Sequence, residues 1–127
     1  MAKYSKLKEA AAIVRAEMTE EERAAALQAA AFHLFISAPR KASHSGSEQQ
    51  AYLGLLFATL GGIEVPPEVW KGHGWFFANR ATEWAESHLH VERYPTTKAQ
   101  WWDLEERYYL YYYLDRLREM IREREQE

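Results

Sequence analysis

The chain has 127 residues, of which 47% are hydrophobic and 28% charged, with a formal net charge of -3 at pH 7. This size and composition predict a single folded domain, residues 1–127, and exclude a disordered chain. The absence of cysteine excludes disulfides and thiolate ligands, and the net negative charge argues against nucleic-acid binding driven by overall charge.

The first third of the chain predicts two helices. Apolar residues recur at three- and four-residue spacing between residues 3 and 18, which is typical of an amphipathic helix. Thr19 and Glu22 have the spacing of a capping box, so a second helix begins there. The body of this helix is apolar on nearly every side, which indicates a central position, and we expect Pro39 to end it. His33 is expected to be a core histidine with one hydrogen-bonded nitrogen.

The linker after the second helix is the best candidate for contact with phosphate. Cations and hydroxyls precede a helix start there, where free backbone N–H groups and the helix dipole favour an anion. The candidate nucleic-acid-binding residues are Arg40, Lys41, Ser45 and Ser47, with Lys71 further along the chain. The linker lacks the glycine spacing of a phosphate-binding loop, so a solvated loop is the competing interpretation.

The middle of the chain predicts three more helical segments. A helix is predicted over residues 47–60, where Gly54 allows a close crossing and the Gly61–Gly62 pair provides the stop. Proline and glycine positions predict a short helix over residues 67–70 and a longer one over residues 75–90.

The longer of these helices carries a possible cation site on one face, made of Asn79, Glu83, Glu86 and His90. A carboxylate metal site in a helical bundle takes ligands from a second helix as well. No matching Glu-x-x-His sequence occurs elsewhere in the chain. We therefore expect a solvated face, with no bound metal and no cofactor.

The stretch from Thr97 to Glu125 predicts one long C-terminal helix, capped by Thr97 and Gln100. Its apolar stripe changes sides halfway along, because Leu104 and Tyr108 lie nearly opposite Leu117 and Ile121 on a helical wheel. Such a segment must be covered on both sides, either by helices of the same chain or by a partner.

Five tyrosines occur between residues 108 and 113, more than a domain of this size can fully bury. Tyrosine suits a wet interface, since its ring is apolar and its hydroxyl can still bond. The predicted protein interface consists of Tyr109, Tyr112, Tyr113, Leu117 and Ile121. If both stripes of the helix are core, this interface must lie elsewhere.

These patterns predict an all-α, compact bundle of about five helices with a long C-terminal helix. No nucleophile with a base, paired acid and base, or cofactor loop is found, so we expect no enzymatic activity and no small-molecule substrate. The leading hypothesis is a small helical interaction module: a subunit, adaptor or inhibitor that docks on a larger assembly, or self-associates, through its aromatic C-terminal half. That half is acidic, since residues 67–127 hold nine basic and twelve acidic side chains.

The alternative is a small helical subunit of a nucleoprotein complex of the RNA-guided type, to which the chain is similar in size and helical content. A local basic face would then contact nucleic-acid backbone. Under either hypothesis we expect a soluble, cytoplasmic protein without membrane contact, because no secretory signal and no apolar segment of spanning length is found.

Overall fold

The computed structural model describes residues 2–40 and 45–126, which form helices joined by loops, and no strand occurs in this part of the chain. The predicted all-α fold class is confirmed. The helices are α1 (Ala2–Glu17), α2 (Glu20–Ala31), the π-helix η1 (Phe32–Ser37), α3 (Ala38–Arg40), α4 (Ser45–Leu60), the 3₁₀-helix η2 (Pro67–Trp70), α5 (Gly74–His88), α6 (Lys98–Tyr108) and α7 (Leu110–Glu125). None of these described helices is long and apolar enough to cross a membrane.

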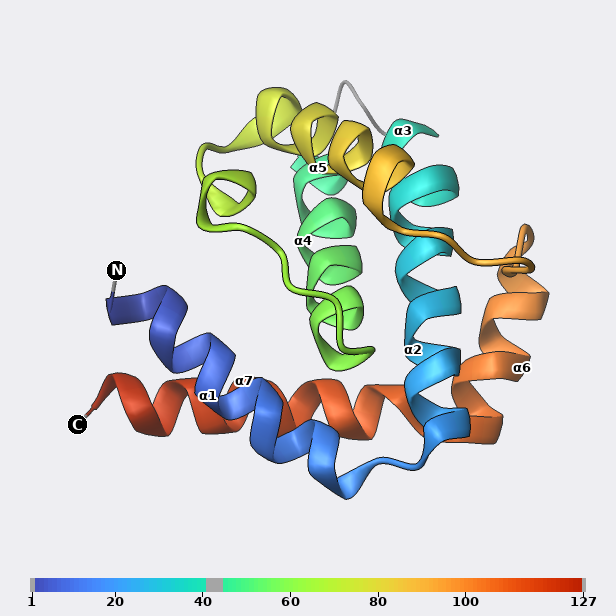
Figure 1. Ribbon diagram of the computed structural model, residues 1–127. Coiled ribbons are helices and arrows are strands. Elements are labelled where there is room, and N and C mark those ends of the chain that lie inside the picture. Colours follow the sequence, from blue (N-terminus) through green and yellow to red (C-terminus); the bar gives the residue numbers. More distant parts are fainter. Residues whose placement is uncertain (1, 41–44, 127) are drawn as a thin grey trace.

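The centre of the fold is an antiparallel pair formed by α2, with its continuation η1, and α4 (Figure 1). Glycine at two positions lets these helices approach closely. A Cβ atom on Gly54 would lie 2.6 Å from Cγ of Leu34, and one on Gly61 would lie 2.3 Å from Cδ2 of Leu27. The predicted close crossing at Gly54 is therefore confirmed.

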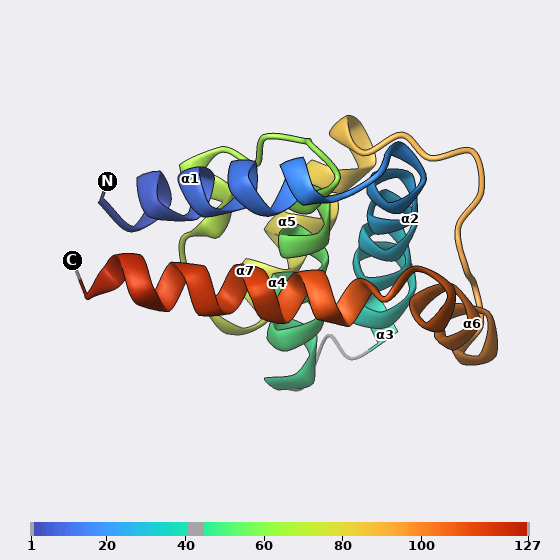
Figure 2. The ribbon, with the colours of Figure 1, turned by 90° about the horizontal axis from the view of Figure 1, so that it is seen from below.

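A second antiparallel pair, α1 and α7, crosses the central pair and brings the beginning and end of the described chain together (Figure 2). Val14 of α1 and Leu114 and Leu117 of α7 are fully buried. Near the chain ends, the Arg124 guanidinium lies 3.2 Å from the Glu9 carboxylate.

The C-terminal segment is two helices, so the prediction of one long helix is wrong. The chain turns at Tyr109, whose φ of 51° and ψ of 43° place it in the left-handed region. This turn lets α6 pack beside α2 while α7 runs along α1 (Figure 1). The turn explains why the apolar stripe changes sides along the sequence. With the chain turned at Tyr109, Trp101 and Leu104 on α6 and Leu117 on α7 are all buried in one core.

The helix containing Pro39 also differs from the prediction, because it continues through Pro39 to Arg40. The π-helix η1 precedes this proline, and the Ala38 N–H donates to the His33 carbonyl five residues back. Pro39 has no N–H to donate to Leu34 in the same pattern. The hydroxyl of Thr82 on α5 donates to the Leu34 carbonyl instead, at 3.2 Å.

The predicted helix signals elsewhere in the chain are confirmed. The capping boxes at Thr19 and Thr97 are both formed. Gly62 ends α4 with a φ of 100°, and the short helix over Pro67–Trp70 is present. The helix predicted to reach residue 90 ends at His88.

Candidate interaction surface

Three large aromatic side chains stand out from the protein where α6 meets α7. Trp102 is 56% exposed, Tyr109 70% and Tyr112 60%. Trp102 is on α6, seven residues before Tyr109, at which the chain turns into α7. Tyr112 is in the first turn of α7, and its backbone N–H donates to the Tyr109 carbonyl at 3.0 Å. We call these three exposed residues on either side of the turn, Trp102, Tyr109 and Tyr112, the α6–α7 corner.

Tyr109 combines a strained backbone with an exposed side chain. Among the described residues, it is the one non-glycine residue with a positive φ. The left-handed conformation costs about 1 to 2 kcal/mol for a residue with a side chain. Most of the Tyr109 ring lies in solvent, so packing of its own side chain does not offset this strain. Strained residues of this kind concentrate at functional sites.

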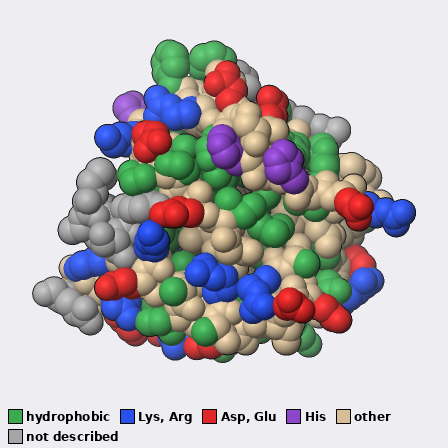
Figure 3. Space-filling view, viewed as in Figure 1, with side chains coloured by type: hydrophobic (Ala, Val, Ile, Leu, Met, Phe, Trp, Pro, Cys, Tyr) green, Lys and Arg blue, Asp and Glu red, His purple; other side chains and the backbone are tan. Residues whose placement is uncertain are grey.

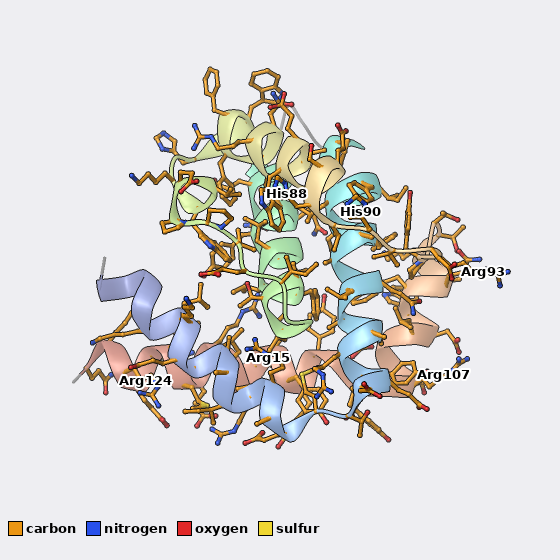
Figure 4. The ribbon with its side chains drawn as sticks, viewed as in Figure 1. Arg15, His88, His90, Arg93, Arg107 and Arg124 are labelled. Atoms are coloured by element: carbon orange, nitrogen blue, oxygen red, sulfur yellow. The ribbon has the colours of Figure 1, made fainter. Side chains whose placement is uncertain are left out.

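Charged groups of both signs accompany the aromatic residues of the corner. The Lys98 ammonium lies 4.8 Å from the centroid of the Trp102 ring. Arg107, which points away from the body of the protein on α6 (Figure 4), is paired with Asp103 at 2.7 Å. Both of these ionic side chains are more than 60% exposed, so their pairing contributes little to stability. They form a polar edge to an aromatic surface, an arrangement seen at protein interfaces.

The five predicted interface residues differ in burial and do not share one exposed surface. Tyr109 and Tyr112 lie on the corner, whereas Leu117 is fully buried and Ile121 packs partly against the core. Tyr113 is half-buried, and its hydroxyl donates to the Glu22 carboxylate at 2.6 Å. Leu117 is therefore a core residue in this fold, because α7 turns its second stripe towards α1 and α4.

Trp102 was not among the predicted interface residues, although the sequence contains a signal for it. On a helical wheel Trp102 and Tyr109 share a side with Lys98, about a quarter turn or more from buried Trp101 and Leu104. A large aromatic residue on the polar side of an amphipathic helix is an exposed one.

Comparison of the chain with models of protein families, with curated proteins and with solved structures finds no match. The candidate surface is therefore defined by the geometry of the chain itself.

The hydrogen bond between Tyr113 and Glu22 joins α7 to α2 and shifts both pKa values. The pKa of Tyr113 is raised to about 12 by burial and by its bond to the Glu22 carboxylate. Burial acts to raise the pKa of Glu22, but hydrogen bonds from the Thr19 backbone and the Tyr113 hydroxyl outweigh burial and lower it.

Tyr113→Phe is expected to lower the free energy of unfolding by about 1 kcal/mol at neutral pH, because it removes this hydrogen bond. Tyr113 holds its proton more tightly when folded, so its contribution is fully present below the ordinary pKa of 10. The contribution is lost as the pH rises through about 12. Urea unfolding of the parent and variant at several pH values between 8 and about 11 should therefore show a shrinking difference in stability. A difference in stability that stays constant over this range would contradict the expected dependence of stability on the ionisation of Tyr113.

The predicted nucleic-acid-binding residues do not form a basic face in the described part of the chain. Lys41 and the side chains of Arg40 and Ser45 lie outside the described residues. Ser47 is fully buried, so it is not a surface contact. Lys71 is exposed just before α5, where Trp75 and Phe76 are also exposed. On the face seen in Figure 3, the basic side chains of the described residues are interspersed with acidic ones, apart from a few that lie close together below its centre.

The possible cation face on α5 also does not form a metal site. No group of three or more metal-ligating side chains is found in the described residues. His88 turns back onto its own helix, where its ring stacks on Trp84 and its Nδ1 lies 2.9 Å from the Trp84 carbonyl oxygen. His90 lies beyond the end of α5 on the same face of the protein (Figure 4), beside a shallow groove that Glu86 also lines.

Proposed function

We propose that this protein is a small helical interaction module that binds a partner protein through the α6–α7 corner. The observation that carries the proposal is Tyr109, a residue with a strained backbone that is 70% exposed. Glycine would adopt the same backbone conformation without the steric cost. A bulky aromatic residue at this position is explained if its side chain has a use outside the folding of the monomer.

The chemistry of the corner supports a protein partner. Tyrosine and tryptophan are enriched among the residues that dominate binding energy at protein interfaces. The hydroxyls of Tyr109 and Tyr112 can hydrogen-bond at an interface while their rings are covered. The surrounding Asp103–Arg107 pair and Lys98 provide charges of both signs at the edge of the surface, which suits a partner with a mixed polar rim.

Tyr109→Gly separates binding from folding. We expect the free energy of unfolding to stay the same or rise by up to about 1 kcal/mol, because glycine relieves the strain while losing some entropy on folding. Binding to the partner should weaken by about 30-fold or more, the effect of removing an interface residue worth about 2 kcal/mol. Thermal unfolding gives the first quantity. Quantitative capture from native lysate, with sedimentation of the pure protein to detect self-association, gives the second.

Phe76→Ala is the matched control, because Phe76 is 72% exposed on α5 and lies outside the corner. The control should retain binding, whereas Trp102→Ala and Tyr112→Ala should weaken it as Tyr109→Gly does. If all three corner variants bind as well as the parent, the corner is not the interface. Loss of binding in Phe76→Ala alone would place the interface at the start of α5.

A further inference from the structure

A pocket of about 680 Å³ lies between η1, α4 and the beginning of α6. Aromatic rings form its inner wall. Phe32 and Trp101 are stacked with 5.8 Å between their centroids, and Tyr111 meets Trp101 edge to face at 5.9 Å. Exposed Trp102 and Lys98 also line the pocket. A concave space of this size, which combines aromatic rings with polar side chains that can orient a ligand, is suited to a small molecule.

A polar group with unused donors lies in this pocket. The Gln50 side-chain oxygen accepts two hydrogen bonds, from His33 Nδ1 at 2.6 Å and from the Ser37 hydroxyl at 2.8 Å. Because the oxygen is the acceptor in both bonds, the Gln50 amide nitrogen retains two N–H groups to donate. Within the described residues this nitrogen donates no hydrogen bond. Gln50 therefore offers donors towards a ligand that carries an acceptor.

The π-helix positions these polar groups. His33 and Ser37 are both in η1, and both reach Gln50 on the neighbouring helix α4. His33 is only 3% exposed and is held between Phe57 and Trp101, with ring centroids at 5.7 and 4.8 Å. The orientation of the Gln50 amide is thus set by buried neighbours. A π-helix such as η1 is rare and recurs at functional sites. Its presence here supports a binding role for the pocket.

We propose that this pocket binds a small planar aromatic anion of the aromatic carboxylate class. The ring would pack against half-buried Tyr111 and exposed Trp102, which supply flat apolar surfaces beside buried Trp101. The carboxylate, which can only accept hydrogen bonds, would be bound by the Gln50 amide and by the Lys98 ammonium. This inference goes beyond the proposed interaction module and does not depend on it, because binding is measured on the isolated protein.

The test is calorimetric titration of the full chain with three probes that separate shape from charge. 2-Naphthoate is planar and anionic, 2-naphthamide has the same rings without the charge, and cyclohexanecarboxylate has the charge without the planar ring. We expect 2-naphthoate to bind at least about 10-fold more tightly than either of the others, since one good charged contact is worth about 1.4 kcal/mol or more. Equal binding of 2-naphthoate and 2-naphthamide, or no binding of 2-naphthoate at millimolar concentration, overturns the proposal.

Two variants locate the bound anion. Gln50→Glu keeps an acceptor oxygen for His33 and Ser37 but replaces the amide donors with a second acceptor and a negative charge. Lys98→Met removes the charge from an exposed side chain and keeps its length. Each should weaken 2-naphthoate binding at least about 10-fold, and Lys98→Met, which removes only a charge, should leave the binding of 2-naphthamide within about twofold. Lys71→Met, at an exposed lysine that does not line the pocket, is the control and should bind as the parent does. Unchanged 2-naphthoate affinity in both pocket variants would place the anion elsewhere.

Discussion

Leu117→Ala is expected to lower the free energy of unfolding by about 2 to 5 kcal/mol, the range for large-to-small substitutions in a packed core. Leu117 is fully buried on α7, in the layer that packs against α1 and α4. Removing its three outer carbon atoms leaves a cavity that two rigid neighbouring helices cannot close. Urea unfolding followed by circular dichroism measures the change.

Tyr112→Ala on the same helix is the control for Leu117→Ala. Tyr112 is 60% exposed, so its removal should change the stability of the monomer by no more than about 0.5 kcal/mol. The contrast between these two α7 variants separates the core stripe from the α6–α7 corner. A Leu117→Ala protein as stable as the parent would mean that α7 does not pack as described.

Gly54→Val is expected to destabilise the fold by about 1 to 3 kcal/mol or more, because it overpacks the crossing of the two central helices. Its Cβ would lie 2.6 Å from Cγ of Leu34, which is fully buried, and 3.3 Å from the Ala30 carbonyl oxygen. Neither neighbour can move without shifting η1 or α2. The thermal unfolding midpoint should fall by several degrees for a domain of this size.

Gly61→Ala is the comparison for Gly54→Val, because it meets a neighbour that can move. The added Cβ would lie 2.3 Å from Cδ2 of Leu27 and 3.3 Å from the Arg23 carbonyl oxygen, but Leu27 is only partly buried whereas Leu34 is fully buried. We expect the smaller destabilisation here. If Gly61→Ala is the more harmful of the two, the Leu27 side chain does not move aside and the contact at Gly61 is the more rigid one.

Features that depend on neighbouring residues were predicted from the sequence. The Thr19 and Thr97 capping boxes each bring together groups three residues apart, so their residue types are sufficient to identify them. Gly62 occupies the left-handed position that glycine adopts most easily, and it ends α4 as predicted.

The turn at Tyr109 was not predicted, because no local rule favours it. Tyrosine is a poor residue for the left-handed region, and no glycine, proline or asparagine marks the position. The break is favoured by the burial of α6 against α2 and of α7 against α1, elements distant in the sequence. The one sign of the turn in the sequence was that the apolar stripe changes sides. That pattern fits two helices buried in one core just as well as it fits a single straight helix that also binds a partner.

The pocket residues were missed for the same reason. Nothing in the sequence distinguishes Gln50 and Ser37 from other helix residues. The π-helix η1, from which Ser37 reaches Gln50, has no sequence pattern that predicts it. Lys98 and Trp101 reach the pocket only because α6 packs beside α2. Candidate sites made by helices far apart in sequence require the tertiary structure.

The pairing of α1 with α7 has a consequence for the synthesis of the protein. The helix α1 packs chiefly against α7, whose buried Leu114 and Leu117 lie about one hundred residues further along the chain. At about 5 to 20 residues per second, α1 must wait roughly 5 to 20 seconds for its partner helix. The contact between α1 and α7 therefore forms only after α7 has been synthesised, and until then the apolar side of α1 is available to chaperones and to other nascent chains.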